Sequence, residues 1–247
     1  RTFNNLNALN DQANEVAEYL NIQDKFSLTG DFKYLDDAEK IYLKIIKISE
    51  DSNIESVKRD NYTSKDNLGG IYLSRGDFDT ALPLVEEVYE ECIKINDKKH
   101  PDCLTQMISL ANVVSVFDLN RAIIIMEDFL KLESKTNRNF LRQRVNARVT
   151  LSVLYSDNGE YKKSDDLIIE AVNLIDPTDT RFRDIYVTTM NSYYLQILKN
   201  GQAHNAINGY LELIEFVDKN IGYKAKIKLE LLNNIGFSYS AIKDYEN

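Results

Sequence analysis

The chain has 247 residues, 43% of them hydrophobic and 28% charged, so it is long and apolar enough to bury a substantial core. Only 3 prolines and 9 glycines interrupt it, which favours long helices over many short strands. The formal charge of -9 and the lack of a run rich in Lys and Arg argue against nucleic acid as a partner.

Targeting signals are missing from the residues at hand. No run of about 18 apolar residues occurs, so no membrane-spanning segment is predicted. Arg1 to Asn10 lacks the apolar stretch of a signal peptide, and a signal upstream of Arg1 is left open. Cys92 and Cys103 do not make a disulfide framework, so we predict two free buried thiols and a reducing, cytoplasmic location.

A pattern of apolar, small and aromatic residues recurs along the chain. An irregular first copy lies around Phe26, Gly30 to Phe32, Ala38 and Tyr42. The clearest copy reads Leu68-Gly69, Tyr72, Gly76-Asp77-Phe78 and Ala81, and it returns as Leu151-Ser152, Tyr155, Gly159-Glu160-Tyr161 and Ser164. A further matching copy begins at Ile235-Gly236, and weaker copies begin at Leu110-Ala111 and Tyr193-Tyr194. The leading apolar residues of the five later copies therefore follow one another at steps of 42, 41, 42 and 42 residues.

Each copy is predicted to be a helical hairpin. Within 60–73 and 78–95, apolar residues recur three and four apart, which gathers them on one face of a helix. Gly76, Gly159 and Gly201 stand where the first helix must end, a position that favours a left-handed backbone. We expect small residues, such as Gly69, to let helices approach closely, and the following large ones to fill the adjacent space; these are Tyr72, Tyr155, Phe78, Tyr161 and Tyr245.

The order Leu68, Gly69, Tyr72, Gly76 and Phe78 resembles the tetratricopeptide repeat, and the resemblance covers about residues 30 to 247. The 42-residue step and the helix that opens at 100–102 (His-Pro-Asp) are similar to the kinesin-light-chain class of these repeats. The resemblance implies an all-α solenoid of stacked antiparallel helix pairs, a TPR-like superhelix. A HEAT or armadillo array is the opposing fold, because its period also fits the spacing.

The whole chain, 1–247, is predicted to be a single repeat domain. Its units are an irregular one at about 1–58, then about 60–100, 101–140, 141–180 and 181–222, and a truncated one at 223–247. Since that unit breaks off after Tyr245, we expect a larger protein to continue beyond Asn247, with self-association through the apolar end as a possible consequence.

In this family the first helix of each hairpin lines a concave groove. The resemblance places ten short polar residues there as a peptide-binding set, namely Thr63, Asn67, Thr105, Ser109, Asn112, Asn146, Thr150, Thr188, Ser192 and Asn234. An asparagine such as Asn67 or Asn234 tends to clamp a peptide backbone in kinesin-light-chain-like repeats. Because none of these side chains is basic, we predict a neutral groove that binds an extended peptide or loop, with simple solvation of these side chains as the alternative.

Catalytic motifs are missing. There is no phosphate-binding glycine loop, no His-Glu-x-x-His helix and no Gly-x-Ser-x-Gly elbow, and His100 and His204 are the only histidines. Cys92, His100 and Cys103 lack a fourth metal ligand. We therefore predict no enzyme, cofactor or metal site, but a scaffold for a protein partner. The alternative is a sensing arm of a larger sensor kinase, transcription regulator or caspase-like protease.

Overall fold

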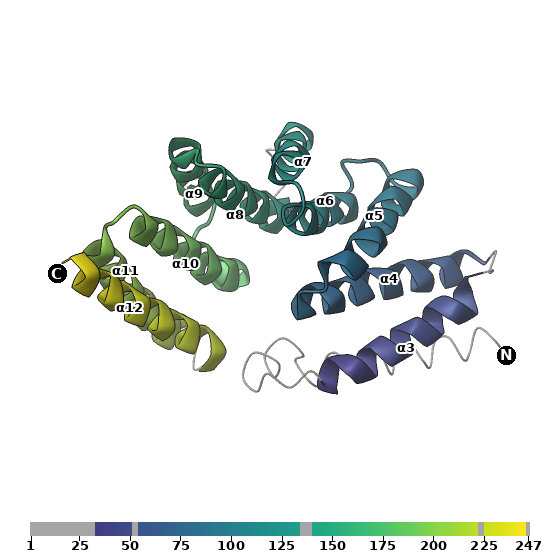
Figure 1. The fold of residues 1–247 in the computed structure, drawn as a ribbon, viewed down its shortest axis with the longest axis horizontal. Coiled ribbons are helices and arrows are strands. Elements are labelled where there is room, and N and C mark those ends of the chain that lie inside the picture. The colour runs from purple at the N-terminus through teal and green to yellow at the C-terminus, as the bar shows by residue number, and fades with distance from the viewer. Residues whose placement is uncertain (1–32, 51–53, 134–139, 222–224, 246–247) are drawn as a thin grey trace. The chain divides into compact units, whose positions relative to one another are not determined.

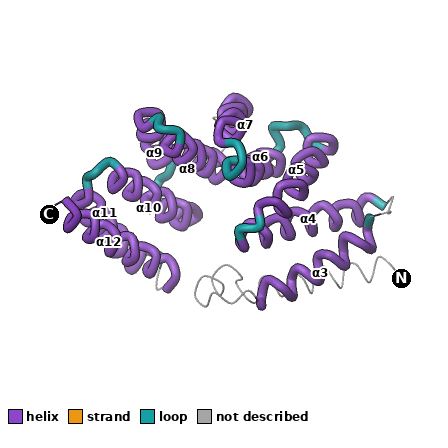
Figure 2. The backbone as a smooth tube through the Cα atoms, viewed as in Figure 1, coloured by secondary structure: helices purple, strands orange, loops and turns teal. Residues whose placement is uncertain are grey.

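The computed structural model describes residues 33–50, 54–133, 140–221 and 225–245. Helices account for nearly all of these ranges and no strand occurs in them, as Figure 2 shows. The prediction of an all-α helical-repeat fold is therefore confirmed. None of the described helices is both long enough and apolar enough to pass through a bilayer. The chain divides into two compact units, residues 1–118 and 119–247, which we call unit 1 and unit 2.

Unit 1 contains four described helices, drawn from purple to teal in Figure 1, and each of them contacts the next. They are α3 (Lys33–Ser49), α4 (Glu55–Arg75), α5 (Phe78–Ile95) and α6 (Pro101–Val114). In the terms of the repeat, α4 and α6 are first helices, and α3 and α5 are second helices. The predicted copy around Phe26 and 30–32 lies outside the described residues, but Ala38 and Tyr42 of that copy are buried in the core of unit 1.

Unit 2 continues the alternation, with α8, α10 and α12 as first helices and α7, α9 and α11 as second helices (Figure 1). Its elements are α7 (Leu119–Leu132), α8 (Leu141–Asp157), α9 (Tyr161–Asn173), η2 (Thr180–Phe182), α10 (Arg183–Lys199), α11 (Ala203–Asn220) and α12 (Ala225–Tyr245). Besides the hairpin contacts, α10 touches both α8 and α12, so that three first helices lie in succession.

Three glycines end first helices as predicted. Gly76, Gly159 and Gly201 have φ values of 73°, 79° and 78°, in the left-handed region where a side chain would be strained. At the first of them, Gly76 N–H donates to the carbonyl of Leu73 and the next N–H donates to that of Tyr72, which satisfies carbonyls that the helix leaves open. These three hairpins therefore turn at the glycine that the pattern indicated.

Small residues allow close helix contact where the repeat predicts them. A methyl group on Gly69 would lie 3.1 Å from Val85 of α5, and Ser152 of α8 lies beside Ser164 of α9, with hydroxyl oxygens 3.0 Å apart. The expectation is wrong at two places. Tyr161 is 59% exposed, whereas Phe78 at the same repeat position is half-buried, and nothing lies within 4 Å of a Cβ built on Gly236.

The tyrosine of the repeat makes the same polar contact in both units. The Tyr72 hydroxyl donates to Glu39 of the preceding second helix at 2.8 Å, and the Tyr155 hydroxyl donates to Glu127 at 2.5 Å. Burial and the hydrogen bond to Glu39 raise the pKa of Tyr72 to about 12, so its proton stays in place at neutral pH. A repeat position that the sequence assigned to packing thus also joins successive hairpins.

The two cysteines are bonded to each other, which corrects the prediction of free thiols. Cys92 and Cys103 are buried as expected, but they form a disulfide with Cα atoms 5.5 Å apart. The short connection from α5 to α6 brings the end of one helix beside the start of the next, within the usual range for a disulfide. The cytoplasmic location was argued from free thiols, so the disulfide removes its basis. Neither sulfur remains to bind a metal with His100.

Candidate functional site: the exposed faces of the first helices

The ten predicted peptide-binding residues occur on first helices in both units and are exposed or half-buried. Unit 1 places Thr63 and Asn67 on α4 and Thr105, Ser109 and Asn112 on α6; unit 2 places Asn146 and Thr150 on α8, Thr188 and Ser192 on α10, and Asn234 on α12. None of them belongs to the apolar core. We call the exposed side that they occupy the first-helix face of each unit.

Ion pairs fix the register of the first-helix face in unit 2. Arg142 of α8 binds Asp184 of α10 through two hydrogen bonds of 2.7 and 2.9 Å, across 42 residues of sequence. About four turns further along the same two helices, Asp157 lies 3.8 Å from Lys199, again 42 residues apart. Because both ends of the helix pair are matched at the same spacing, the residues between them also lie in matched rows.

Two kinds of row follow from this register. The polar rows are Asn146 with Thr188 and Thr150 with Ser192, and α12 extends the second of them with Asn234. The Asn234 amide donates to Asn191 of α10 at 2.8 Å, which aligns α12 with α10. An apolar row of Val153, Leu195 and Phe237 lies one turn further on. Val153 and Phe237 are 45% and 68% exposed, and Leu195 is half-buried. The sequence analysis missed this row, although its residues stand two positions after each leading apolar residue.

The face between the two ion pairs is nearly neutral. The row positions of α8 and α10 between the pairs are amide, hydroxyl or apolar, and Glu230 stands on α12 at the position that corresponds to Asn146 and Thr188. Hydrogen bonding to Arg142 lowers the pKa of Asp184, since the guanidinium favours the ionised carboxylate more than burial disfavours it. The flanking charges therefore neutralise each other rather than attract a charged ligand.

The polar side chains differ in what they can still bind. Thr105, Thr188 and Ser192 donate their hydroxyl hydrogens to carbonyls of their own helices at 3.0 to 3.2 Å, which leaves oxygen lone pairs as acceptors. One amide hydrogen of Asn234 is engaged by Asn191. Asn67, Asn112 and Asn146, by contrast, have no side-chain partner in the described part of the chain, so both their donors and their acceptor remain available.

Each unit also contains a surface hollow that is lined in part by a first helix. Thr63 lines a pocket of about 390 Å³ between α4, the end of α5 and the start of α6, in unit 1. In unit 2, a shallower hollow of about 360 Å³ lies among α7, α8 and α9 and contains none of the ten residues. Across the described ranges, no group of three or more His, Cys, Asp or Glu side chains is arranged to hold a metal ion.

The end of unit 2 carries further exposed apolar surface. On α12, Leu229, Leu232, Phe237 and Tyr239 are each 48% to 68% exposed. Self-association through this helix stays a prediction, and these four side chains are where a second copy would bind.

Comparison with known proteins agrees with the repeat pattern. The sequence model of the tetratricopeptide repeat family matches residues 63–102, which includes α5 and parts of α4 and α6. No match was found among curated proteins.

Solved structures share the fold over a larger part of the chain. A single-substitution variant of nearly identical TPR-like repeats, assigned to a kinesin light chain of Podosopora anserina, has a TM-score of 0.63 at 17% identity, covering 87% of this chain and 95% of that one. A second structure of those repeats has a TM-score of 0.57 at 18% identity, covering 74% and 88%. BtubC (BKLC) from P. vanneervenii has a TM-score of 0.56 at 12% identity, covering 100% and 85%.

At these identities the likeness shows the fold alone, and TPR-like repeats of this kind generally serve as protein-interaction scaffolds. Residues 63–102 thus match the tetratricopeptide repeat, and they lie in an all-α helical-repeat fold that is similar to those solved TPR-like repeats.

Proposed function

We propose that the chain is a protein-interaction scaffold whose first-helix faces bind an extended peptide segment or loop of a partner. The observation that carries the proposal is the in-register arrangement on unit 2, where ion pairs align two polar rows and one apolar row across α8 and α10. An extended peptide presents main-chain N–H and C=O groups to polar rows and side chains to an apolar row. Hydroxyl oxygens and free amides supply both kinds of partner that such a main chain needs.

The free asparagine amides are the side chains that we expect to matter most. Asn146 in unit 2, and Asn67 and Asn112 in unit 1, can pair with both groups of a peptide bond, whereas Asn234 has one donor already used. A buried peptide group that loses such a partner costs about 1–3 kcal/mol. We therefore expect these three residues, more than Asn234, to act as the main-chain clamps.

The test is a selection of extended peptides on the 247-residue chain, followed by affinity measurement of the selected peptides with variants. For peptides that bind unit 2, Asn146→Ala with Thr150→Val should weaken binding by roughly tenfold, because two main-chain contacts are lost. The matched control is Asn208→Ala, an exposed asparagine on the second helix α11, which should change affinity less than about twofold.

Equal effects of the double variant and of Asn208→Ala would overturn the assignment of the first-helix face. The corresponding pair for unit 1 is Asn67→Ala with Asn112→Ala. We propose no catalytic role, and the alternative of a sensing arm stays a prediction because it concerns sequence beyond these 247 residues.

A further inference from the structure

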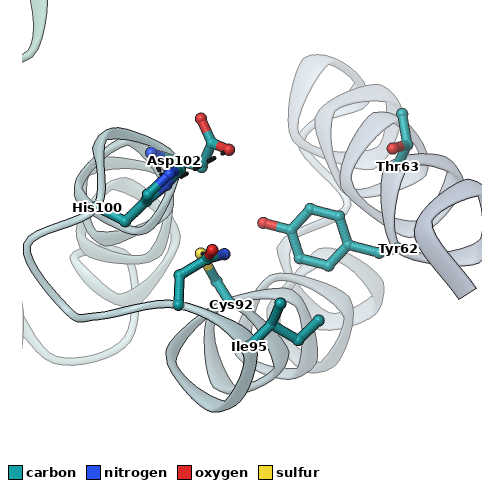
Figure 3. Close-up of a pocket in the computed structure, with 7 residues that line it drawn as sticks. Tyr62, Thr63, Cys92, Ile95, His100 and Asp102 are labelled. Atoms are coloured by element: carbon teal, nitrogen blue, oxygen red, sulfur yellow. Dashed lines mark hydrogen bonds and ion pairs between the residues drawn. The ribbon is translucent and has the colours of Figure 1, made fainter. Parts of the chain in front are cut away.

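The pocket in unit 1 has a chemical character that the rest of the first-helix face lacks. It holds about 390 Å³, within the range of about 300–1,000 Å³ that small-ligand pockets occupy. Tyr62 and Thr63 line it from α4, Ile95 and Asn96 from the end of α5, and His100 and Asp102 from the start of α6. Figure 3 shows the Tyr62 hydroxyl pointing from α4 into the space before His100 and Asp102.

Two polar atoms at this place are buried without hydrogen-bond partners. They are the Tyr62 hydroxyl and Oε1 of Gln106; the Gln106 side chain is close enough to Tyr62 to act on its pKa, but neither atom has a hydrogen bond of standard geometry. A buried polar group without a partner is costly, and the hydroxyl is directed into the pocket. A ligand with N–H donors would give the Tyr62 oxygen the partner that it lacks.

The charges around the Tyr62 hydroxyl are negative. Burial raises the pKa of Tyr62 to about 12, and the neighbouring carboxylates Asp66, Asp102 and Glu91 act in the same direction. Burial also raises the pKa of Asp66. Glu91 also lines an adjacent hollow together with Lys58 and Lys94. Asp102 is the acidic residue that lines the Tyr62 pocket, whereas Asp66 acts on Tyr62 from outside that lining.

No lysine or arginine of the described chain lines this pocket or forms an ion pair with Asp66 or Asp102. Lys98 and Lys99 precede His100 but are not part of the lining. His100 lies on the other side of Asp102: its Nδ1 accepts a hydrogen bond from Asp102 N–H at 3.4 Å and is 3.6 Å from the Asp102 carboxylate. The pocket lining thus combines one carboxylate, that of Asp102, with the aromatic ring of Tyr62, and it contains no lysine or arginine.

We propose that this pocket binds a basic side chain, arginine or lysine, of a peptide that lies along the first-helix face of unit 1. A guanidinium group pairs with the Asp102 carboxylate, donates to the Tyr62 oxygen and packs against the Tyr62 ring. Thr63 connects the two features, since it lines the pocket and belongs to the polar set of α4. The inference rests on the proposed peptide-binding function, to which it adds the class of side chain that unit 1 selects.

The first experiment needs no peptide. Acetyl-arginine amide is titrated into the isotope-labelled 247-residue chain under non-reducing conditions, and amide shifts of Thr63, Asn96 and Asp102 are followed by NMR. Acetyl-citrulline amide, a neutral compound of the same shape, is the matched probe. We expect saturable shifts at these residues with the arginine compound and at least about tenfold weaker binding with citrulline, because the charged hydrogen bonds are lost.

A pair of variants isolates the carboxylate. Asp102→Asn should weaken binding of acetyl-arginine amide by about five- to tenfold. Asp79→Asn is the control, because Asp79 is also an exposed acid in the first turn of a helix, α5, but does not line the pocket. Tyr62→Phe should weaken binding by a smaller factor. Equal affinities for arginine and citrulline, or equal effects of the two Asp variants, would overturn the inference.

The peptide selection separates this inference from the proposed function. Suppose that peptides bind unit 1 through Asn67 and Asn112, and that replacing the basic residues of these peptides by citrulline leaves their affinity for the chain unchanged. The pocket assignment is then wrong and the scaffold function stands. If acetyl-arginine amide binds the pocket and no peptide binds the chain, the pocket chemistry is correct and the scaffold function is wrong.

Discussion

The two units follow the same repeat pattern but use different bonds to hold it. Lys65 of α4 and Arg148 of α8 occupy the same repeat position, three residues before the leading apolar residue. Each pairs with a glutamate 22 residues later, Glu87 at 2.5 Å in unit 1 and Glu170 at 3.1 Å in unit 2. Only Arg148 also binds Glu133, a carboxylate with 1% exposure at the end of α7. Unit 1 has instead the disulfide between α5 and α6. The same repeat pattern therefore gives the same helix packing in both units, whereas the bonds that join neighbouring helices differ from one hairpin to the next.

The largest expected difference comes from removing the two equivalent cations. Arg148→Met leaves the buried Glu133 carboxylate with Arg144, at 3.5 Å, as its remaining cationic partner among the described residues, and should cost unit 2 about 3 kcal/mol. Lys65→Met breaks a pair whose glutamate is 47% exposed, and should cost unit 1 less than about 1 kcal/mol. Hydrogen exchange with mass spectrometry reports each unit separately. Similar losses for both variants would contradict the distinction.

Removing the disulfide should destabilise unit 1 by almost as much and should leave unit 2 unaffected. It joins residues 11 apart, for which the chain-entropy estimate is about 3 kcal/mol. The double variant Cys92→Ala, Cys103→Ala should therefore lower protection from exchange in α5 and α6 and leave α8 to α12 unchanged. Alkylation of the denatured, unreduced chain is the direct check, since a disulfide permits no labelling and labelled thiols would refute it.

Replacing a helical glycine by alanine should change stability in opposite directions in the two units. A Cβ on Gly209 of α11 would lie 2.1 Å from the Tyr194 ring, which is already packed against Tyr210, so Gly209→Ala should cost about 1–3 kcal/mol. Gly70 of α4 has nothing within 4 Å, and Gly70→Ala should gain up to about 1 kcal/mol from helix propensity. Thermal unfolding of the two variants measures both effects, and a stabilised Gly209→Ala would show that the ring contact is loose.

The smallest effect concerns acid stability in unit 1. Burial alone would raise the pKa of Glu39, but hydrogen bonds from Arg75 and Tyr72 outweigh it and lower this pKa below its usual 4.5. A carboxylate with a lowered pKa contributes its stability above the unfolded value and loses it as the pH falls through the folded value. Unit 1 should therefore weaken below about pH 4.5, and Glu39→Gln should reduce that dependence. Denaturant unfolding at neutral pH and at about pH 3.5 tests this, and an unchanged pH dependence would contradict it.

Much of the fold could be predicted because it depends on local rules. The glycines at 76, 159 and 201 specify left-handed helix ends, and Pro101 begins α6 as a proline in a first turn should. The buried small residues Ala81, Ala122, Ser164 and Ala206 are fully inaccessible because the 42-residue register places them between helices. These features need only residue spacing.

The remaining features depend on contacts that spacing does not reveal. The disulfide depends on how closely one connection brings α5 and α6 together, and the Arg148–Glu133 pair joins helices whose relative rotation the pattern leaves free. In the candidate site, the sequence indicated the ten polar residues. It did not show which of them are already hydrogen-bonded, or that Tyr62 and Asp102 face one pocket.

The two matched ion pairs of unit 2 also restrict how the chain can vary in length. Arg142–Asp184 and Asp157–Lys199 engage opposite ends of α8 and α10. Deleting one residue within either helix would rotate one end against the other by about 100°, so that one pair could form only at the expense of the other. Additions between the helices, in the connections before and after α9, disturb neither. Insertions and deletions in natural variants should accordingly collect in those connections, away from the polar and apolar rows.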